Sequence, residues 1–125
     1  MSTASAFALI YATCCALPLA MQIGLAMGAP WGRFANGGRH PGVLPPRWRI
    51  LAVVQGSLLA AMAWVVLARA GVIAAEVPDG LFWAALGLSI LTAIANAISP
   101  SRPERLLWAP VTCAMAVSAL AVAFL

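Results

Sequence analysis

Four long segments without a single charged residue dominate this sequence. They cover residues 7–29, 50–68, 81–98 and 106–125. An α-helix rises 1.5 Å per residue, so about 20 residues cross the ~30 Å hydrocarbon layer of a membrane. Backbone polar groups in that layer need partners within the chain, which favours helices. The sequence therefore predicts an all-α fold in which residues 1–125 form one bundle of four transmembrane helices, at about 7–29, 50–70, 81–98 and 105–125.

The composition leaves no room for a water-soluble domain beside these spans. Hydrophobic residues make up 64% of the 125 residues and charged residues only 8%, whereas soluble domains carry about 25% charged residues. The longest predicted connection is residues 30–49, and the other two connections are short turns. We therefore expect an integral membrane protein without an evident catalytic site.

The positive charges are distributed unevenly between the two ends of the bundle. There is no lysine, and the first and third connections hold six arginines, namely Arg33, Arg39, Arg47, Arg49, Arg102 and Arg105. Basic residues favour the cytoplasmic side of a membrane. The sequence thus predicts both termini on the outer, periplasmic side of a bacterial inner membrane. Since the arginines flank spans, we interpret them as topology signals and expect no nucleic-acid partner.

The first connection, residues 30–49, is rich in glycine, proline and arginine and cannot be helical throughout. Asn36-Gly37-Gly38 predicts a turn, and Pro45-Pro46 stiffens the chain before the second span. In one interpretation the loop lies on anionic lipid headgroups, anchored by its two tryptophans. In the other it is a structured lid that offers guanidinium groups to an anionic headgroup, phosphate or partner carboxylate. The guanidinium candidates are Arg33, Arg39, Arg47 and Arg49.

Small and weakly polar residues at helical spacing predict the packing faces of the spans. In the first span Tyr11, Cys15, Pro18 and Gln22 predict one buried face. Ala20, Gly24 and Gly28 predict a second face, on which another backbone approaches closely. We therefore expect neighbours on two sides of the first span.

Three amide side chains are predicted to lie at one depth in the cytoplasmic leaflet, namely Gln22, Gln55 and Asn96. Thr112 and Cys113 reach a comparable depth. An unpaired amide in hydrocarbon is strongly unfavourable, so these side chains should point inward and bond one another, a water or a ligand. This polar layer beneath the arginine-rich loop is the predicted binding site.

Local signals predict where helices begin and where aromatic residues meet the membrane surface. Ser101 and Glu104 have the spacing of a capping box at the start of the fourth span. Asp79 is expected to cap the third span. Trp31, Trp48, Trp83 and Trp108 lie near span ends, as expected for an interfacial belt.

The three cysteines, Cys14, Cys15 and Cys113, lie inside the predicted spans, where cysteine is most often a small buried hydrophobe. The segment Thr13-Cys14-Cys15-Ala16-Leu17-Pro18 resembles the vicinal-cysteine segment in the first span of small mercuric-ion uptake proteins. The resemblance implies transport of a soft metal ion held by Cys14 and Cys15. His40 is the only histidine, which excludes bis-histidine haem ligation within one chain.

The sequence favours a protein that works by packing and binding. No acidic residue lies within the uncharged segments, which disfavours proton-coupled transport through a buried carboxylate. We expect a non-enzymatic accessory, assembly or lipid-binding subunit that needs no cofactor. It would contact anionic lipids and pack against itself or a larger membrane partner. One alternative is a small transporter of a soft metal or solute using Cys14 and Cys15. Another is an enzyme acting on a membrane-dissolved substrate near Gln22 and Arg49.

Overall fold

The computed structural model describes residues 1–125 and contains only helices. In chain order these are α1 (Thr3–Ala26), α2 (Pro46–Arg69), α3 (Asp79–Ala97) and α4 (Arg102–Phe124). Two short 3-10 turns, η1 (Gly32–Phe34) and η2 (Asn36–Gly38), lie in the loop between α1 and α2. Each of the four long helices is long and apolar enough to cross a membrane. The predicted all-α fold with four helices of membrane-spanning length is confirmed.

Each long helix begins a few residues before its uncharged segment. Capping side chains and prolines set the helix starts, and glycines set two of the helix ends. The Ser2 side chain accepts a hydrogen bond from the Ser5 N–H, which starts α1 at Thr3. Pro46 occupies the first turn of α2, where a missing N–H has no consequence. Gly28 (φ 96°) follows the C-terminal end of α1, and Gly71 (φ 78°) follows that of α2. Both have a left-handed backbone conformation, which ends an α-helix.

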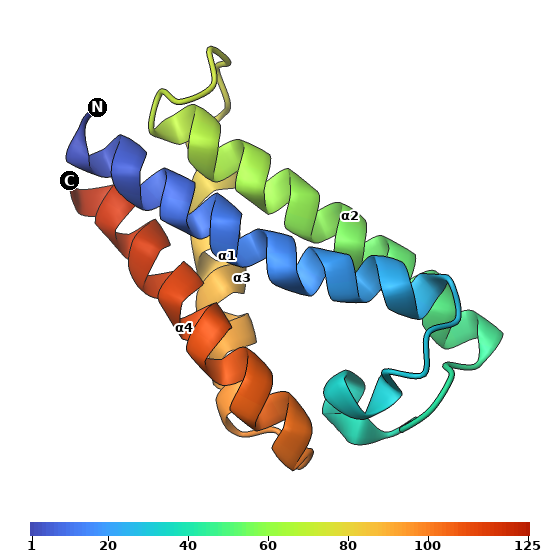
Figure 1. The fold of residues 1–125 in the computed structure, drawn as a ribbon. Coiled ribbons are helices and arrows are strands. Elements are labelled where there is room, and N and C mark those ends of the chain that lie inside the picture. Colours follow the sequence, from blue (N-terminus) through green and yellow to red (C-terminus); the bar gives the residue numbers. More distant parts are fainter.

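The helices form two antiparallel pairs that diverge toward one end of the molecule. Figure 1 shows α1 beside α2 and α3 beside α4, and the first part of α1 also lies beside the last part of α4. Both termini and the α2–α3 connection lie at one end, which we call the terminal end. The α1–α2 loop and the α3–α4 turn lie at the other, which we call the loop end. The divergence leaves space between the pairs at the loop end.

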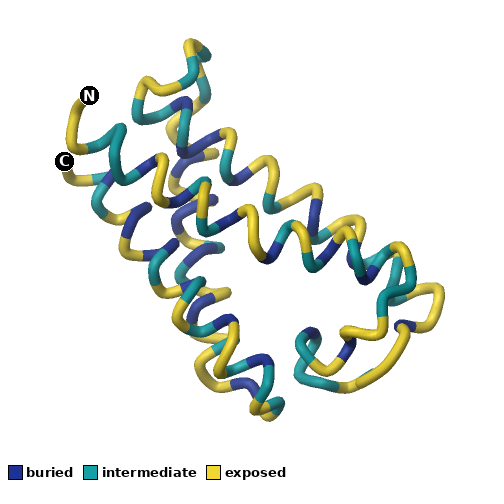
Figure 2. Tube along the Cα trace, viewed as in Figure 1, coloured by how far each residue is buried: buried dark blue, intermediate teal, exposed yellow.

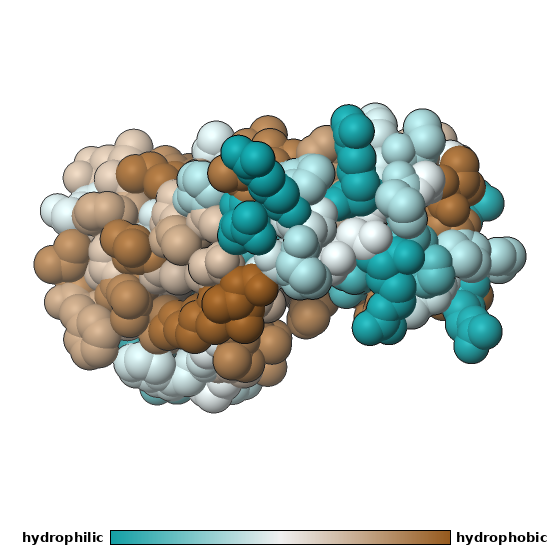
Figure 3. All heavy atoms as spheres, turned by 90° about the horizontal axis from the view of Figure 1, so that it is seen from below, coloured by the Kyte–Doolittle hydropathy of each residue, from teal (hydrophilic) through white to brown (hydrophobic).

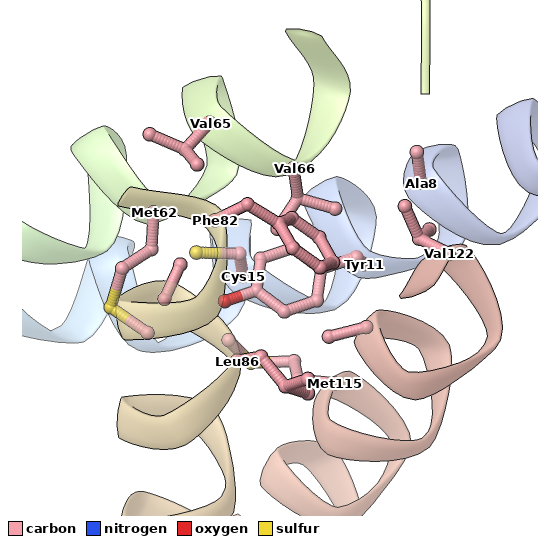
Figure 4. Close-up of a cluster of buried hydrophobic side chains, with 12 residues drawn as sticks. Ala8, Tyr11, Cys15, Met62, Val65, Val66, Phe82, Leu86, Met115 and Val122 are labelled. Carbon is pink, nitrogen blue, oxygen red and sulfur yellow. The ribbon is translucent and has the colours of Figure 1, made fainter. Parts of the chain in front are cut away.

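A hydrophobic core joins all four helices in the terminal half of the bundle. Its largest fully buried side chains include Tyr11 of α1, Val66 of α2, Phe82 of α3 and Met115 of α4. Figure 4 shows these side chains converging from the surrounding helices. In Figure 2 the buried positions face the bundle interior and the exposed ones face outward. The predicted inner face of α1 is confirmed, because Tyr11, Cys15, Pro18 and Gln22 are all buried.

The predicted second face of the first span is occupied differently from our expectation. Ala20 is exposed, and a Cβ added at Gly24 would overlap the ring of Trp31 from the following loop. At Gly28 the nearest neighbour is the Arg49 guanidinium. The close approach at Gly24 is therefore to an aromatic side chain rather than another helix backbone. The glycine leaves room for a ring that folds back on its own helix.

The expected cap of the third span by Asp79 is wrong. Pro78 is the N-cap residue of α3 and Asp79 is its first helical residue. The Asp79 carboxylate instead forms an ion pair with Arg69 at 3.1 Å, and the Arg69 guanidinium also lies 4.6 Å from the centroid of the Phe82 ring. The carboxylate still lies in the first turn, where the helix dipole favours negative charge.

One hydrogen bond crosses the core between α1 and α3. The Tyr11 hydroxyl and Ser89 Oγ are 2.7 Å apart, and Ser89 Oγ donates to the Ala85 carbonyl, also at 2.7 Å. The single hydroxyl hydrogen of Ser89 is used in that second bond, so Tyr11 donates to Ser89. A polar contact thus fixes the register of two helices within an otherwise apolar cluster.

We predict that this bond couples α1 to α3. Tyr11→Phe and Ser89→Ala should each lower the free energy of unfolding in detergent, with a coupling of ~0.6 kcal/mol in the double variant. Thr13→Val is the matched control, because the exposed Thr13 hydroxyl bonds only the Leu9 carbonyl of its own helix. Strictly additive effects of Tyr11→Phe and Ser89→Ala would contradict the coupling.

Candidate functional site

A cavity of about 330 Å³ lies between the diverging helix pairs near the loop end. All four helices and the α1–α2 loop contribute to its wall. Nine of its seventeen lining residues are hydrophobic, so it combines apolar walls with polar groups. The polar lining consists of Gln22, Asn36, Gln55, Thr92, Asn96, Glu104 and Thr112, together with the indole of Trp108. Cavities of this size and mixed lining are typical of small-molecule sites.

The three amides of the predicted polar layer all line this cavity. Gln22 comes from α1, Gln55 from α2 and Asn96 from α3, and Thr112 of α4 joins them. Cys113, expected at the same depth, is exposed on the outside of α4. Thus the structure brings Gln22, Gln55 and Asn96 to one cavity, while their part in binding stays a prediction.

The amides do not bond one another. Asn96 Nδ2 donates to Thr112 Oγ1 at 3.3 Å, and Thr112 Oγ1 donates to the Trp108 carbonyl at 2.7 Å. Gln22 Oε1 and Trp108 Nε1 are both buried without a hydrogen-bond partner, and these residues are only 9% and 7% exposed. Buried polar groups are nearly always paired, so an unpaired acceptor on α1 and an unpaired donor on α4, both in residues that line the cavity, need explanation.

The four arginines predicted for the site lie outside the cavity lining. Arg49 Nε donates to the Ala26 carbonyl at 3.1 Å, which ties the start of α2 to the end of α1. The guanidinium carbons of Arg33 and Arg39 lie 4.8 Å and 5.5 Å from the ring centroids of Phe34 and Trp48.

Arg47 is exposed. Because the backbone turns at η1 and η2, the loop presents Phe34, Ala35 and Asn36 to the cavity, and its cationic groups lie elsewhere. Figure 3, which views the molecule from below, shows hydrophilic residues gathered over one side of this face and hydrophobic residues over the other. The amides and the arginines therefore form two separate features.

Glu104 is a cavity residue that the sequence did not single out for the site. It is 7% exposed, and its carboxylate Oε2 accepts a hydrogen bond from the Gly37 N–H at 2.9 Å. The only ion pair in the structure joins Arg69 to Asp79, so no cationic side chain neutralises Glu104. A buried carboxylate without a cation gives this part of the wall a negative or strongly hydrogen-bond-accepting character.

Of the two hydrogen bonds of the capping box predicted at the start of the fourth span, only one forms. The Glu104 N–H donates to Ser101 Oγ at 3.4 Å, as expected. The Ser101 N–H, however, donates to Ser99 Oγ, and the Glu104 side chain contacts the loop instead of its own helix start. The carboxylate is diverted because η2 presents the Gly37 N–H beside it.

Trp108 also differs from its predicted place at the membrane interface, since it is buried and lines the cavity. The sequence contains a signal for Glu104 and Trp108, the two cavity residues that the sequence analysis did not assign to the site. Glu104, Trp108 and Thr112 recur every fourth residue, which places them on one face of a helix. That face of α4 is the cavity wall.

Two hydrogen bonds fasten the α1–α2 loop to the start of α4, and we call this pair the latch. They are the bond from the Gly37 N–H to Glu104 and a bond of 2.6 Å from Ser101 Oγ to the Arg33 carbonyl. Gly38 passes so close that an added Cβ would stand 2.9 Å from Ser101 Cβ. The loop is thus structured, and the turn predicted at Asn36-Gly37-Gly38 has positive φ at all three residues.

The cysteines of the first span take part in packing. Cys15 is buried in the core, and its thiol donates to the Leu59 carbonyl at 3.3 Å, whereas Cys14 is half-buried. No group of three or more His, Cys, Asp or Glu side chains lies together in the structure. The soft-metal interpretation thus gains no additional ligand beside Cys14 and Cys15.

No family model, curated protein or solved structure matches this chain. Its function therefore has to be inferred from the chemistry of the cavity and its surroundings.

We predict that Gly38→Ala opens the latch. The substitution places a Cβ against Ser101 at a residue with φ 74°. Loosening by ~1 kcal/mol would raise tryptic cleavage after the exposed Arg39 about fivefold. Gly71→Ala is the matched control, because Gly71 has φ 78° and open space around its Cβ position. If Gly38→Ala is cleaved after Arg39 no faster than Gly71→Ala, the contact of Gly38 with Ser101 does not hold the loop.

Proposed function

We propose that this chain is a non-enzymatic, multi-pass protein of a bacterial inner membrane that binds a lipid-like amphiphile in the cavity between its helix pairs. One observation carries the proposal. Gln22 and Trp108 line a cavity in which nine of the seventeen lining residues are hydrophobic, and Gln22 Oε1 and Trp108 Nε1 are buried without a hydrogen-bond partner. A ligand with a polar head and an apolar tail would pair these groups and cover the hydrophobic lining.

Access from the bilayer supports an amphiphile rather than a water-soluble ligand. The cavity-lining residues Leu58 of α2 and Thr92 and Ala95 of α3 are exposed. They mark an opening between α2 and α3, through which a molecule dissolved in the membrane can enter. The α1–α2 loop, held by the latch, contributes Phe34, Ala35 and Asn36 to the cavity lining at the loop end.

The proposed orientation places the loop end in the cytoplasm and both termini in the periplasm. Its support is the position of six arginines at the loop end, which the positive-inside tendency favours on the cytoplasmic side. In this orientation the cavity opens to the cytoplasmic leaflet. Exposed arginines, including Arg39, Arg47 and Arg102, would hold the loop end against anionic headgroups.

Assembly is the second part of the proposal. An apolar groove runs along the outside of the α1–α2 pair and is lined by small residues, including Ala26, Ala52, Gly56 and Ala60. Small residues let helices approach closely in lipid. We therefore propose that the chain packs against a second copy or a larger membrane partner along this groove, as an accessory subunit does.

We predict that filling the cavity removes bound amphiphile. Thr92→Phe should lower the amount of co-purified lipid-like molecule about tenfold, corresponding to a loss of ~1.4 kcal/mol of binding free energy. Native mass spectrometry of the protein in mild detergent measures the retained molecules. The matched control is Leu91→Phe, because Leu91 is the neighbouring residue of α3, is 62% exposed and does not line the cavity.

Thermal unfolding of both variants provides a check on the fold. If Thr92→Phe and Leu91→Phe retain the same molecules in the same amounts, the cavity is not the binding site. Recovery of the parent protein with no bound amphiphile from membranes would also overturn the proposal.

Orientation is testable by thiol labelling in intact cells. In a background of Cys14→Ala, Cys15→Ala and Cys113→Ala, we expect Ala74→Cys to react with a membrane-impermeant reagent. Val43→Cys should react only after permeabilisation. Both positions are exposed in the structure, Ala74 in the α2–α3 connection and Val43 in the α1–α2 loop. The opposite labelling pattern would reverse the assigned orientation.

A further inference from the structure

The polar groups of the cavity also indicate what kind of head group fits it. We infer that the cavity selects amphiphiles with an uncharged, hydroxyl-bearing head and rejects those with an anionic head. This inference rests on the proposed function, because it names the chemical class of the bound amphiphile. Three features of the wall carry it: the free acceptor, the free donor and the charge.

The two unpaired groups require opposite partners. Gln22 Oε1 needs a donor, and Trp108 Nε1 needs an acceptor. A hydroxyl group donates one hydrogen bond and accepts others, so a head with one or two hydroxyls pairs both side chains. A carboxylate or phosphate diester offers acceptors only, and a quaternary ammonium offers neither.

The charge of the wall excludes an anionic head. Glu104 is buried in the lining, and no cationic side chain forms an ion pair with it. No arginine lines the cavity. A second negative charge placed beside Glu104 would be repelled in a medium of low dielectric, with nothing to neutralise it. The arginines of the loop are available only to headgroups at the membrane surface, so surface and cavity would bind different lipids.

Three further polar residues of the lining, Asn96, Thr112 and Gln55, are compatible with a hydroxyl head. Asn96 and Thr112 are bonded to each other, and Thr112 Oγ1 donates to the Trp108 carbonyl. They therefore help to position Trp108 without competing for the ligand. Gln55 lines the cavity from α2, and its amide both donates and accepts.

The test compares four probes with the same dodecyl-length chain and different heads. They are 1-dodecanoylglycerol, dodecanoate, dodecyl phosphate and dodecyltrimethylammonium, each titrated at pH 8 into the parent protein in phosphatidylcholine nanodiscs. Binding is followed by tryptophan fluorescence, and the Trp108→Phe variant identifies the signal of the cavity. We expect 1-dodecanoylglycerol to bind at least about tenfold more tightly than the other three, the effect of a single well-placed hydrogen bond.

Two variants examine the physical cause of this preference. Gln22→Leu should weaken binding of 1-dodecanoylglycerol about tenfold and leave binding of dodecanoate unchanged. Thr13→Val in the same helix is the control and should change neither. Glu104→Gln removes the charge but keeps an oxygen for the Gly37 N–H, so it should raise the affinity for dodecanoate and dodecyl phosphate. Thermal unfolding identifies any variant that does not fold, and the comparison of probes on the parent protein needs no variant.

The possible results separate this inference from the proposed function. If no probe binds in a way that Thr92→Phe abolishes, the proposed function fails. If Thr92→Phe blocks all probes but an anionic or ammonium head binds as tightly as the glycerol head, the cavity binds amphiphiles and the inferred head-group class is wrong. A preference for the glycerol head that Gln22→Leu removes supports both.

Discussion

The apolar core in the terminal half of the bundle holds the four helices together, and the rest of the structure depends on it. Tyr11, Val66, Phe82 and Met115 bring one side chain from each helix into contact there. In lipid, helices associate through such close packing and through a few hydrogen bonds, because the surrounding acyl chains are as apolar as the side chains. With the helices joined at one end, the two pairs are free to diverge toward the other.

The divergence creates a space that the α1–α2 loop and polar side chains occupy. The loop folds back between the pairs and is held by Glu104 and Ser101 at the start of α4. Beneath it, Gln22, Gln55 and Asn96 line a cavity that a simple bundle would fill with leucine or valine. Polar groups inside a membrane protein are unfavourable for stability, and such groups are typically retained for function. This is the physical basis for proposing a bound amphiphile.

Several features of the site can be predicted from the sequence by helical periodicity alone. The inner face of α1 and the common depth of the three amides were predicted from spacing, and the structure brings these amides to one cavity. Glu104 and Trp108 were not predicted for the site, although their spacing of four residues was visible. Their environment depends on the loop, whose path between the helix pairs no local pattern specifies.

The sequence by itself determined the number of helices, their apolar character and the turn at Asn36-Gly37-Gly38, because these follow from local hydropathy and backbone preference. Only the tertiary structure decided which polar groups meet. It separated the arginines from the amides, diverted Glu104 from its own helix start to the Gly37 N–H, and left Gln22 Oε1 and Trp108 Nε1 unpaired in two residues of the cavity lining. The physical reason is that these relations join residues far apart in the chain, and the packing of one helix pair against the other sets their distances.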